Sequence, residues 1–372
     1  MIVVLKYKYL VFINFLMFST AFSFIRKGST SILRRSRASP HSCRKGMDVQ
    51  MSSSSEPEPL INKQRKSVYA FDFDGVICDS EGETCLSAFK AIQAYWPEVV
   101  HQVPAEMAAG PKKIGTRTLK WPDSVDAAEP VALTECPDWL KVKMRALRPV
   151  VETGYENMLL ERLCIEEEIM SIRTKDTTKS RPLTVAEIIA NWDDLKANLM
   201  RRYDARVEEL IEVFGTTRDS WIASDFEGWL GANSFYPVLD AVNNCTCDKY
   251  IITTKDKRFA YKLLENAGCP FEEDKIYGLG SGPKADTLAM LLDKYNSDAP
   301  DGEKTVIHFV EDKVETLEKI CKDPRLDEVR LYFANWGYST PSQKQIAKAN
   351  PRVTCINAIE FMELTSAAYY TV

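Results

Sequence analysis

The sequence predicts an α/β protein that is built on a parallel sheet with helices on both faces. Short apolar runs alternate with amphipathic stretches over residues 249–356, and another apolar run at 68–71 ends in paired acids and a glycine. A long, mainly helical stretch separates these two regions. Alternating strands and helices of this length build parallel sheets, which bind ligands at the carboxyl ends of their strands. We therefore expect the functional residues to follow the strands.

The most informative segment is the end of the first strand, where Asp72 and Asp74 precede Gly75. Side chains two positions apart in an extended strand point to the same side, so the two carboxylates converge on one spot. Such a pair is unfavourable unless a metal binds there or one carboxyl keeps its proton. Both conditions suit phosphoryl transfer, in which one Asp attacks phosphorus and a protonated Asp serves the leaving oxygen. The alternative is a pair that only caps the following helix.

Three later segments also place polar side chains at the ends of apolar elements. One apolar strand ends in Thr253 and Thr254, another ends in Glu311 and Asp312, and Lys284 begins an apolar helix after a glycine-rich loop. Each has an ordinary alternative: hydroxyls that satisfy backbone groups, a solvated lysine, and acids that favour a helix N-terminus. Their order after the Asp pair is what favours a shared site.

In this order the four segments resemble the four motifs of the haloacid-dehalogenase (HAD) superfamily, most of whose members are phosphatases. The resemblance spans roughly residues 64–372. It implies that Asp72 is the nucleophile and forms an aspartyl-phosphate, and that Asp74 is the general acid/base, with a carboxyl that can hold a proton. Thr253 and Thr254 would bind the phosphate through hydroxyls, and Lys284 would supply a fixed positive charge.

The resemblance also implies a divalent metal. A hard ion, most favourably Mg²⁺, takes oxygen ligands and keeps some of its waters. The implied ligands are the Asp72 carboxylate, the Asp74 backbone carbonyl and Asp312. The expected activity is therefore a Mg²⁺-dependent phosphatase that acts on a small phosphorylated metabolite.

One position departs from the superfamily pattern. Thr316 stands where many members carry a second acid, four residues after the motif IV Asp. We expect Glu311 or Glu315 to replace that acid, through water. The departure keeps open a catalytically weak HAD-fold protein that acts in binding or in plastid regulation. A phosphomutase is a third alternative, because its reaction uses the same Asp pair.

Composition limits the other classes of function. The overall charge is −5, but residues 1–47 contain nine Lys or Arg and no acid, so the remaining residues together carry −14. A body this acidic is a poor non-specific nucleic-acid binder. The ten cysteines show no paired spacing and there are three histidines, so neither a zinc site nor a disulfide framework is expected. We expect a monomer.

The N-terminus is predicted to be a targeting segment. Residues 1–50 combine a charged start, a short apolar run and small residues with a basic, serine-rich stretch that lacks acids until residue 48. This resembles the bipartite presequence of proteins that enter plastids of secondary-endosymbiotic algae. The alternative is an ordinary secretory signal. After processing, no stable membrane association is expected. Residues 51–66 are predicted to be a disordered linker.

The distance between the first and second motifs indicates an inserted domain. We predict a core of residues 67–80 and 236–372, and a mainly helical cap of 81–235 that resembles the C1-type cap of the superfamily. The whole pattern resembles a group of plant and algal plastid HAD-like proteins.

Apolar spacing of three and four residues predicts a helix over 139–173, begun or kinked at Pro149. A capping box at Thr184 and another helix over 198–214 are also predicted, whereas 105–137 is predicted to be irregular. Arg148 is the expected substrate-binding residue of the cap. Its alternative is a solvated helix face, as it is for Glu152, Tyr155 and Arg162, which are predicted to lie on the same helix.

The rest of the core alternates in the predicted order. The expected strands are 249–253, 305–310, 328–333 and 352–356, and the expected helices are 256–267, 284–295, 313–321 and 341–349.

Overall fold

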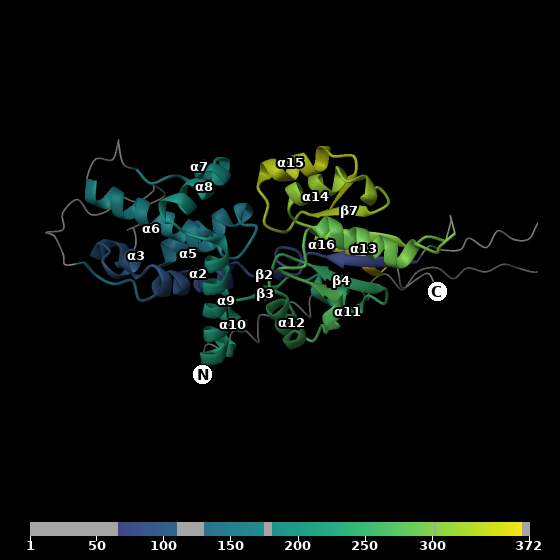
Figure 1. Ribbon diagram of the computed structural model, residues 1–372, viewed down its shortest axis with the longest axis horizontal. Coiled ribbons are helices and arrows are strands. Elements are labelled where there is room, and N and C mark those ends of the chain that lie inside the picture. The colour runs from purple at the N-terminus through teal and green to yellow at the C-terminus, as the bar shows by residue number, and fades with distance from the viewer. Residues whose placement is uncertain (1–65, 110–129, 175–180, 301–302, 367–372) are drawn as a thin grey trace, which may run out of the picture. The chain divides into compact units, whose positions relative to one another are not determined.

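The computed structural model describes residues 66–109, 130–174, 181–300 and 303–366 (Figure 1). Its central element is a sheet of six parallel strands in the order β5-β4-β1-β6-β7-β8. Strand β1 lies between β4 and β6, with Val68 paired to Asp248 on one side and to Ile307 on the other. The predicted parallel sheet is therefore confirmed. Its strands are β1 (Ser67–Phe71), β4 (Asp248–Ile252), β5 (Ile276–Tyr277), β6 (Val306–Glu311), β7 (Arg330–Ala334) and β8 (Val353–Ile356).

Helices cover both faces of this sheet, as predicted. Alternate residues of β1 belong to two separate apolar clusters, because successive side chains of a strand point to opposite faces. Tyr69 and Phe71 pack with α11, α12 and α16, whereas Val68 and Ala70 pack with α13, α14 and α15. These helices are α11 (Leu239–Asn244), α12 (Lys257–Asn266), α13 (Lys284–Asn296), α14 (Val314–Cys321), α15 (Pro341–Ala349) and α16 (Ala358–Ser366).

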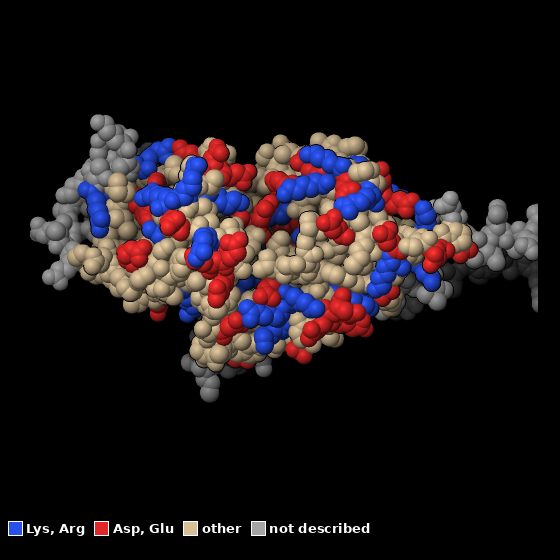
Figure 2. Space-filling model, viewed as in Figure 1, with Lys and Arg blue, Asp and Glu red and all other residues tan. Residues whose placement is uncertain are grey.

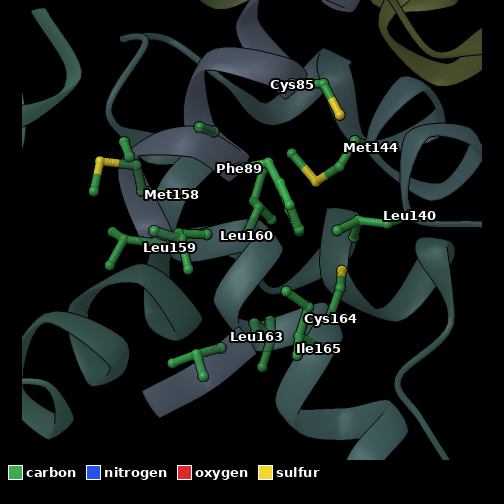
Figure 3. Packing of buried hydrophobic residues seen from close by; sticks show 14 of the residues in the cluster. Cys85, Phe89, Leu140, Met144, Met158, Leu159, Leu160, Leu163, Cys164 and Ile165 are labelled. Carbon is green, nitrogen blue, oxygen red and sulfur yellow. The ribbon is translucent and has the colours of Figure 1, made fainter. Parts of the chain in front are cut away.

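The described residues between β2 and β3 are mainly helical and have their own apolar cluster (Figure 3). Phe89, Leu140, Met144 and Leu159 are among its buried members. The helices are α2 (Glu81–Tyr95), α3 (Pro97–His101), α4 (Ala105–Ala109), α5 (Asp138–Leu147), α6 (Glu156–Thr174), α7 (Val185–Ala190), α8 (Trp192–Arg202), α9 (Val207–Ser224) and α10 (Phe226–Gly231).

The helical stretch predicted over 139–173, begun or kinked at Pro149, is two helices in the structure. Helix α5 ends at Leu147, a 3₁₀ turn spans Arg148–Val150, and α6 begins at Glu156. Pro149 lacks a backbone N–H and restricts the residue before it, so an α-helix does not continue through this position.

Two other predictions for the helical segment also need correction. The helix over 198–214 is two helices, because the chain turns between α8 and α9 at Asp204, whose φ is +48°. The region 105–137 is helical at its start, in α4, and its part from 110 to 129 lies outside the described residues. The capping box at Thr184 and Glu187 is confirmed, and it begins α7.

The helical segment is joined to the sheet region through a short antiparallel ladder. Cys78 of β2 (Cys78–Asp79) pairs with Phe235 of β3 (Ser234–Phe235). The ladder holds the two ends of the helical segment side by side. The bounds of the core and cap domains stay predictions, although both predicted boundaries fall beside this ladder.

All described residues belong to one compact unit, Ile61–Val372. The predicted presequence, and the predicted linker up to residue 65, lie outside them. Within the described ranges, the apolar helices are too short or too polar to cross a membrane. On the face drawn in Figure 2, basic and acidic side chains are interspersed, and such mixing weakens the local potential of a surface.

Candidate active site

The predicted site residues gather where the central strands end. Asp72 follows β1, Thr253 follows β4, and Glu311 is the last residue of β6. They meet because adjacent parallel strands end at the same edge of the sheet. Thr253 is buried, and its Oγ1 accepts a hydrogen bond from the Lys255 N–H (3.1 Å).

Three buried carboxylates form the centre of the site. Asp72, Glu311 and Asp312 each place an oxygen within 4.8 Å of the others, an arrangement that can hold a metal ion. Asp312 Oδ2 accepts the Tyr338 N–H at 2.6 Å, but its buried Oδ1 has no partner among the described residues. Burial, opposed by Lys284 and assisted by Glu311, raises the pKa of Asp72 to about 6. Burial and the neighbouring carboxylates raise the pKa of Asp312 well above its usual value.

Lys284 links two of these acids. As predicted, it is the first residue of an apolar helix, α13. Its Nζ lies 2.8 Å from Asp72 Oδ1 and 2.7 Å from Glu311 Oε2. Burial would lower the pKa of Lys284, but the two carboxylates raise it instead. The lysine therefore keeps a fixed positive charge beside Asp72.

Two glycines let the backbone approach Asp312 closely. Gly75 has a φ of +90°, which glycine adopts without strain, and a Cβ there would overlap the Asp312 carboxylate. A Cβ at Gly337 would lie 2.6 Å from Asp312 Oδ2 and 2.5 Å from the Gly75 carbonyl oxygen. Asp312 is therefore positioned by backbone on two sides.

Asp74 lies apart from the three acids and has different partners. Its Oδ1 accepts a hydrogen bond from Ser80 Oγ (2.6 Å) and lies 3.3 Å from Lys255 Nζ. Burial would raise the pKa of Asp74, but Lys255, Arg148 and the Ser80 hydroxyl lower it below its usual value. This setting favours the ionised form of Asp74, and its role as the general acid/base stays a prediction.

Lys255 is a site residue that the sequence interpretation missed. Its side chain is 1% exposed and lies between Asp74 and Glu83, with Nζ 3.6 Å from Glu83 Oε2. Arg218 pairs with the same Glu83 through Nε and Nη2, both at 2.7 Å. A signal was available, because Lys255 stands two positions after Thr253, the same spacing that joins Asp72 to Asp74.

Arg148 reaches the site from the 3₁₀ turn after α5. It is 6% exposed, and its guanidinium carbon lies 4.2 Å from the centre of the Tyr338 ring. The Tyr338 hydroxyl accepts the N–H groups of Ser80 (2.8 Å) and Glu81 (3.1 Å) and donates to Asp79 (2.8 Å). Tyr338 therefore connects Asp312, Arg148 and the start of α2.

Two cavities meet at Asp74 and Arg148. The first cavity, beside Asp72 and Lys284, has a volume of about 230 Å³. The second, beside Phe214 and Phe259, has a volume of about 210 Å³. Thr254 borders both, and its Oγ1 donates to the Glu152 carbonyl (2.7 Å). The first cavity is lined on its polar side by Asp72, Asp74, Arg148, Lys284, Asp312, Lys313, Thr316 and Lys319. The second is lined on its apolar side by Val151, Tyr155, Ile211, Phe214, Phe259 and Leu279.

The structure separates the two candidates for the missing acid. Glu311 is fully buried beside Asp72, but its Oε1 accepts the N–H groups of Asp312 and Lys313 while Oε2 binds Lys284. Glu315 instead accepts a hydrogen bond from Gln343 (2.7 Å) and borders a neighbouring cavity.

The predicted cap residues also differ in position. Arg148, Glu152 and Tyr155 border the cavities, although none of them lies in an α-helix. Arg162 lies in α6 and stacks instead on the rings of Trp96 (4.6 Å) and Tyr203 (3.7 Å).

Solved structures that are similar to this chain have low sequence identity to it. A predicted phosphatase from Clostridium acetobutylicum has 12% identity and a TM-score of 0.41, with 82% of this chain and 100% of that chain covered. A haloacid dehalogenase-like hydrolase from Streptococcus pneumoniae has 14% identity and a TM-score of 0.40, with 82% and 99% covered. A predicted phosphoglycolate phosphatase from Haemophilus somnus has 11% identity and a TM-score of 0.40, with 82% and 99% covered. TM-scores this low do not establish a common fold. No protein-family model matches the sequence, and no curated protein matches it either.

Proposed function

We propose that the protein is a Mg²⁺-dependent phosphatase that hydrolyses a small phosphate ester through an aspartyl-phosphate on Asp72. The observation that carries the proposal is the setting of the Asp72 carboxylate. It borders a cavity, lies 2.8 Å from the Lys284 ammonium, and shares its site with two further buried acids. A carboxylate nucleophile is repelled by a phosphate ester, so positive charge beside both is what the reaction needs most.

The first step would form the covalent intermediate. An oxygen of Asp72 attacks phosphorus, the bond from phosphorus to the leaving oxygen breaks, and Asp74 gives that oxygen a proton. Burial would raise the pKa of Asp74, but Lys255 and Arg148 lower it. A bound phosphate would compete for these positive charges and raise the pKa of Asp74, so that it can take up the proton that it later donates.

The second step would release phosphate. Asp74, which has lost its proton, accepts one from water, and the water oxygen attacks phosphorus. The bond between phosphorus and Asp72 then breaks, which regenerates the carboxylate. Lys284 would stay paired with Asp72 through both steps and stabilise the charge that returns to it.

The donor atoms fit a hard divalent ion. Asp72 and Asp312 offer carboxylate oxygens, and the buried Asp312 Oδ1 has no partner among the described residues. The Asp74 backbone carbonyl is the third proposed ligand, and Glu311 would support the site through its bonds to Lys284 and the backbone. An all-oxygen set suits Mg²⁺. When bound, the ion would neutralise charge on the phosphoryl oxygens.

The test is phosphate release by the purified chain from a panel of phosphorylated metabolites, with Mg²⁺ and with a chelator. We expect turnover that requires Mg²⁺ and is lost in Asp72→Asn but kept in Asp327→Asn, an exposed control. A parent that releases phosphate from no ester contradicts the proposal and favours the HAD-fold binding or regulatory protein. Formation of a positional isomer of the substrate would indicate a phosphomutase.

A second measurement separates the roles of the two aspartates. Asp74→Asn should slow alkyl phosphates far more than activated aryl phosphates, because an aryl oxide leaves without a proton. Equal rate losses on the two kinds of ester would show that Asp74 is not the general acid.

A further inference from the structure

One wall of the 230 Å³ cavity is basic. Lys313, Thr316 and Lys319 border it, and their spacing of three residues places them along one side of α14, from its N-cap to its last turn. Arg148 borders the same cavity. This basic wall, defined as Arg148, Lys313, Thr316 and Lys319, adds to the positive charge that Lys284 supplies beside Asp72.

The charges of this wall are poorly neutralised by the protein itself. Lys284 and Lys255 each pair with two carboxylates. In contrast, within the described ranges neither Arg148 nor Lys313 lies within ion-pair distance of a carboxylate. Lys319 is 73% exposed at its side chain and lies 3.8 Å from Glu152, a kind of contact that contributes little.

Arg148 is the most buried cation of the basic wall, and no carboxylate lies within ion-pair distance of it among the described residues. It is 94% buried, since its exposure is 6%. Its Nη1 donates to the Val151 carbonyl (3.1 Å), but its Nε has no partner among the described residues. The site's carboxylates act on it only from beyond ion-pair distance. The Tyr338 ring and the Val151 carbonyl offset part of the cost of burying this cation, but no carboxylate neutralises it, so the site favours an anionic ligand.

Lys313 brings a second cation, which is half-buried, to the same place. Its Nζ donates to the Pro149 carbonyl, next to Arg148 in the chain. Lys313 and Arg148 border the same cavity, so their like charges repel each other there. An anion between them would remove this repulsion. An acid at position 316 would do the same, but the chain has Thr316 there.

We propose that the substrate is a small phosphate ester with a second anionic group, which binds at the basic wall while its phosphoryl group binds beside Asp72. The second group is a carboxylate or a second phosphate. This inference rests on the proposed phosphatase function and names its substrate class. The cavity is smaller than the roughly 300–1,000 Å³ typical of sites for drug-sized ligands, so the ester is of small-metabolite size.

The experiment compares three matched esters. Glycerol 3-phosphate has no second anion, 3-phosphoglycerate has a carboxylate in place of one hydroxymethyl group, and propane-1,3-diol bisphosphate has a second phosphate. We expect kcat/KM for at least one of the two esters with a second anionic group to exceed that for glycerol 3-phosphate by about tenfold or more, mainly through a lower KM. The arm with the larger ratio identifies the second group. Ratios near one in both arms would overturn the inference while leaving the phosphatase function intact.

Variants then assign the effect to the basic wall. Lys319→Met should reduce the ratio of kcat/KM for the preferred ester to that for glycerol 3-phosphate, and Lys313→Met should reduce it further. Lys322→Met, an exposed lysine of the same region that does not border the cavity, should keep the parent ratio. Lys319 is exposed, so its variant remains informative if Lys313→Met fails to fold. An unchanged ratio in Lys319→Met and in a folded Lys313→Met would overturn the assignment.

Binding provides a readout that does not depend on turnover. Calorimetric titration of the same three esters into Asp72→Asn should show tighter binding of an ester with a second anion than of glycerol 3-phosphate. If the parent hydrolyses no ester, the proposed function fails, and this titration still decides the subsite. Equal affinity for all three esters would overturn it.

Discussion

Lys255 and Asp74 form a buried ion pair, with Nζ 3.3 Å from Oδ1 and side-chain exposures of 1% and 15%. Lys255 also holds Glu83 at 3.6 Å. Without its ammonium group, Asp74 would lose its ion-pair partner, whereas Glu83 would keep Arg218. The ion pair of the proposed general acid, Asp74, is therefore expected to stabilise the folded protein as well.

Lys255→Met should reduce the free energy of unfolding by about 3–5 kcal/mol, because removal of one partner leaves an uncompensated buried charge. Urea unfolding followed by circular dichroism measures the change. Lys275→Met is the matched control, because Lys275 is a more exposed lysine that also pairs with two carboxylates, Asp248 and Glu272. Its loss should stay within about 1 kcal/mol. If the two variants lost the same free energy of unfolding, burial would not make the Lys255 ion pair more stabilising than the more exposed Lys275 pairs.

Mg²⁺ affinity should depend more on Asp312 than on Glu311. Asp312→Ala removes a carboxylate whose Oδ1 has no partner among the described residues, so we expect binding to fall below detection. Glu311→Gln keeps an acceptor for the two N–H groups and should weaken binding by about 10–100-fold, as the loss of a supporting group does. Calorimetric titration of Mg²⁺ into each variant tests this. If the parent binds no Mg²⁺ at millimolar concentrations, the proposed metal site does not exist.

Gly337→Ala should impair the site without a direct change to any acid. The new Cβ would lie 2.6 Å from Asp312 Oδ2 and 2.5 Å from the Gly75 carbonyl, so Asp312 must move. We expect phosphatase activity and Mg²⁺ affinity to fall together. In Gly231→Ala the new methyl group meets no atom within 4 Å, and this control should keep both. Full activity in Gly337→Ala would mean that the position of Asp312 is not critical.

His308 should make stability dependent on pH. Its ring stacks on Tyr69 (4.7 Å) and Tyr332 (5.7 Å), and burial lowers its pKa to about 4. The unfolded chain has a His pKa near 6.5 and takes up a proton first, so stability falls as pH drops from about 6.5 to 4. We expect this to contribute roughly 2–3 kcal/mol.

The measurement compares His308→Phe with the parent by urea unfolding at pH 7 and pH 4.5. The variant should lose less stability between these two pH values than the parent loses. His101→Gln, at an exposed position in α3, should behave as the parent does. If the parent and His308→Phe lose the same amount, His308 does not titrate as described.

The sheet and the strand-end acids could be predicted because their signals are local. Apolar runs that end in polar residues indicate both the strands and the edge at which Asp72, Thr253 and Glu311 meet. Pro149 indicated an interruption between α5 and α6, but the apolar spacing continues past it, so the pattern did not show that the chain leaves the α-helix until Glu156. The roles of Lys255 and Tyr338 depend on partners far away in the sequence, such as Glu83 and Asp312. Local patterns cannot indicate such partners.

The position of β1 in the middle of the sheet has a consequence for biosynthesis. This strand is among the first parts of the fold to leave the ribosome, yet Val68 pairs with Asp248 on one side and Ile307 on the other. The whole helical segment is translated in the interval. Until then, a strand that is apolar on both faces has no native neighbour, and such unpaired strands are prone to aggregation. The native pairing of β1 can therefore form only after the helical segment, β4 and β6 have all been made.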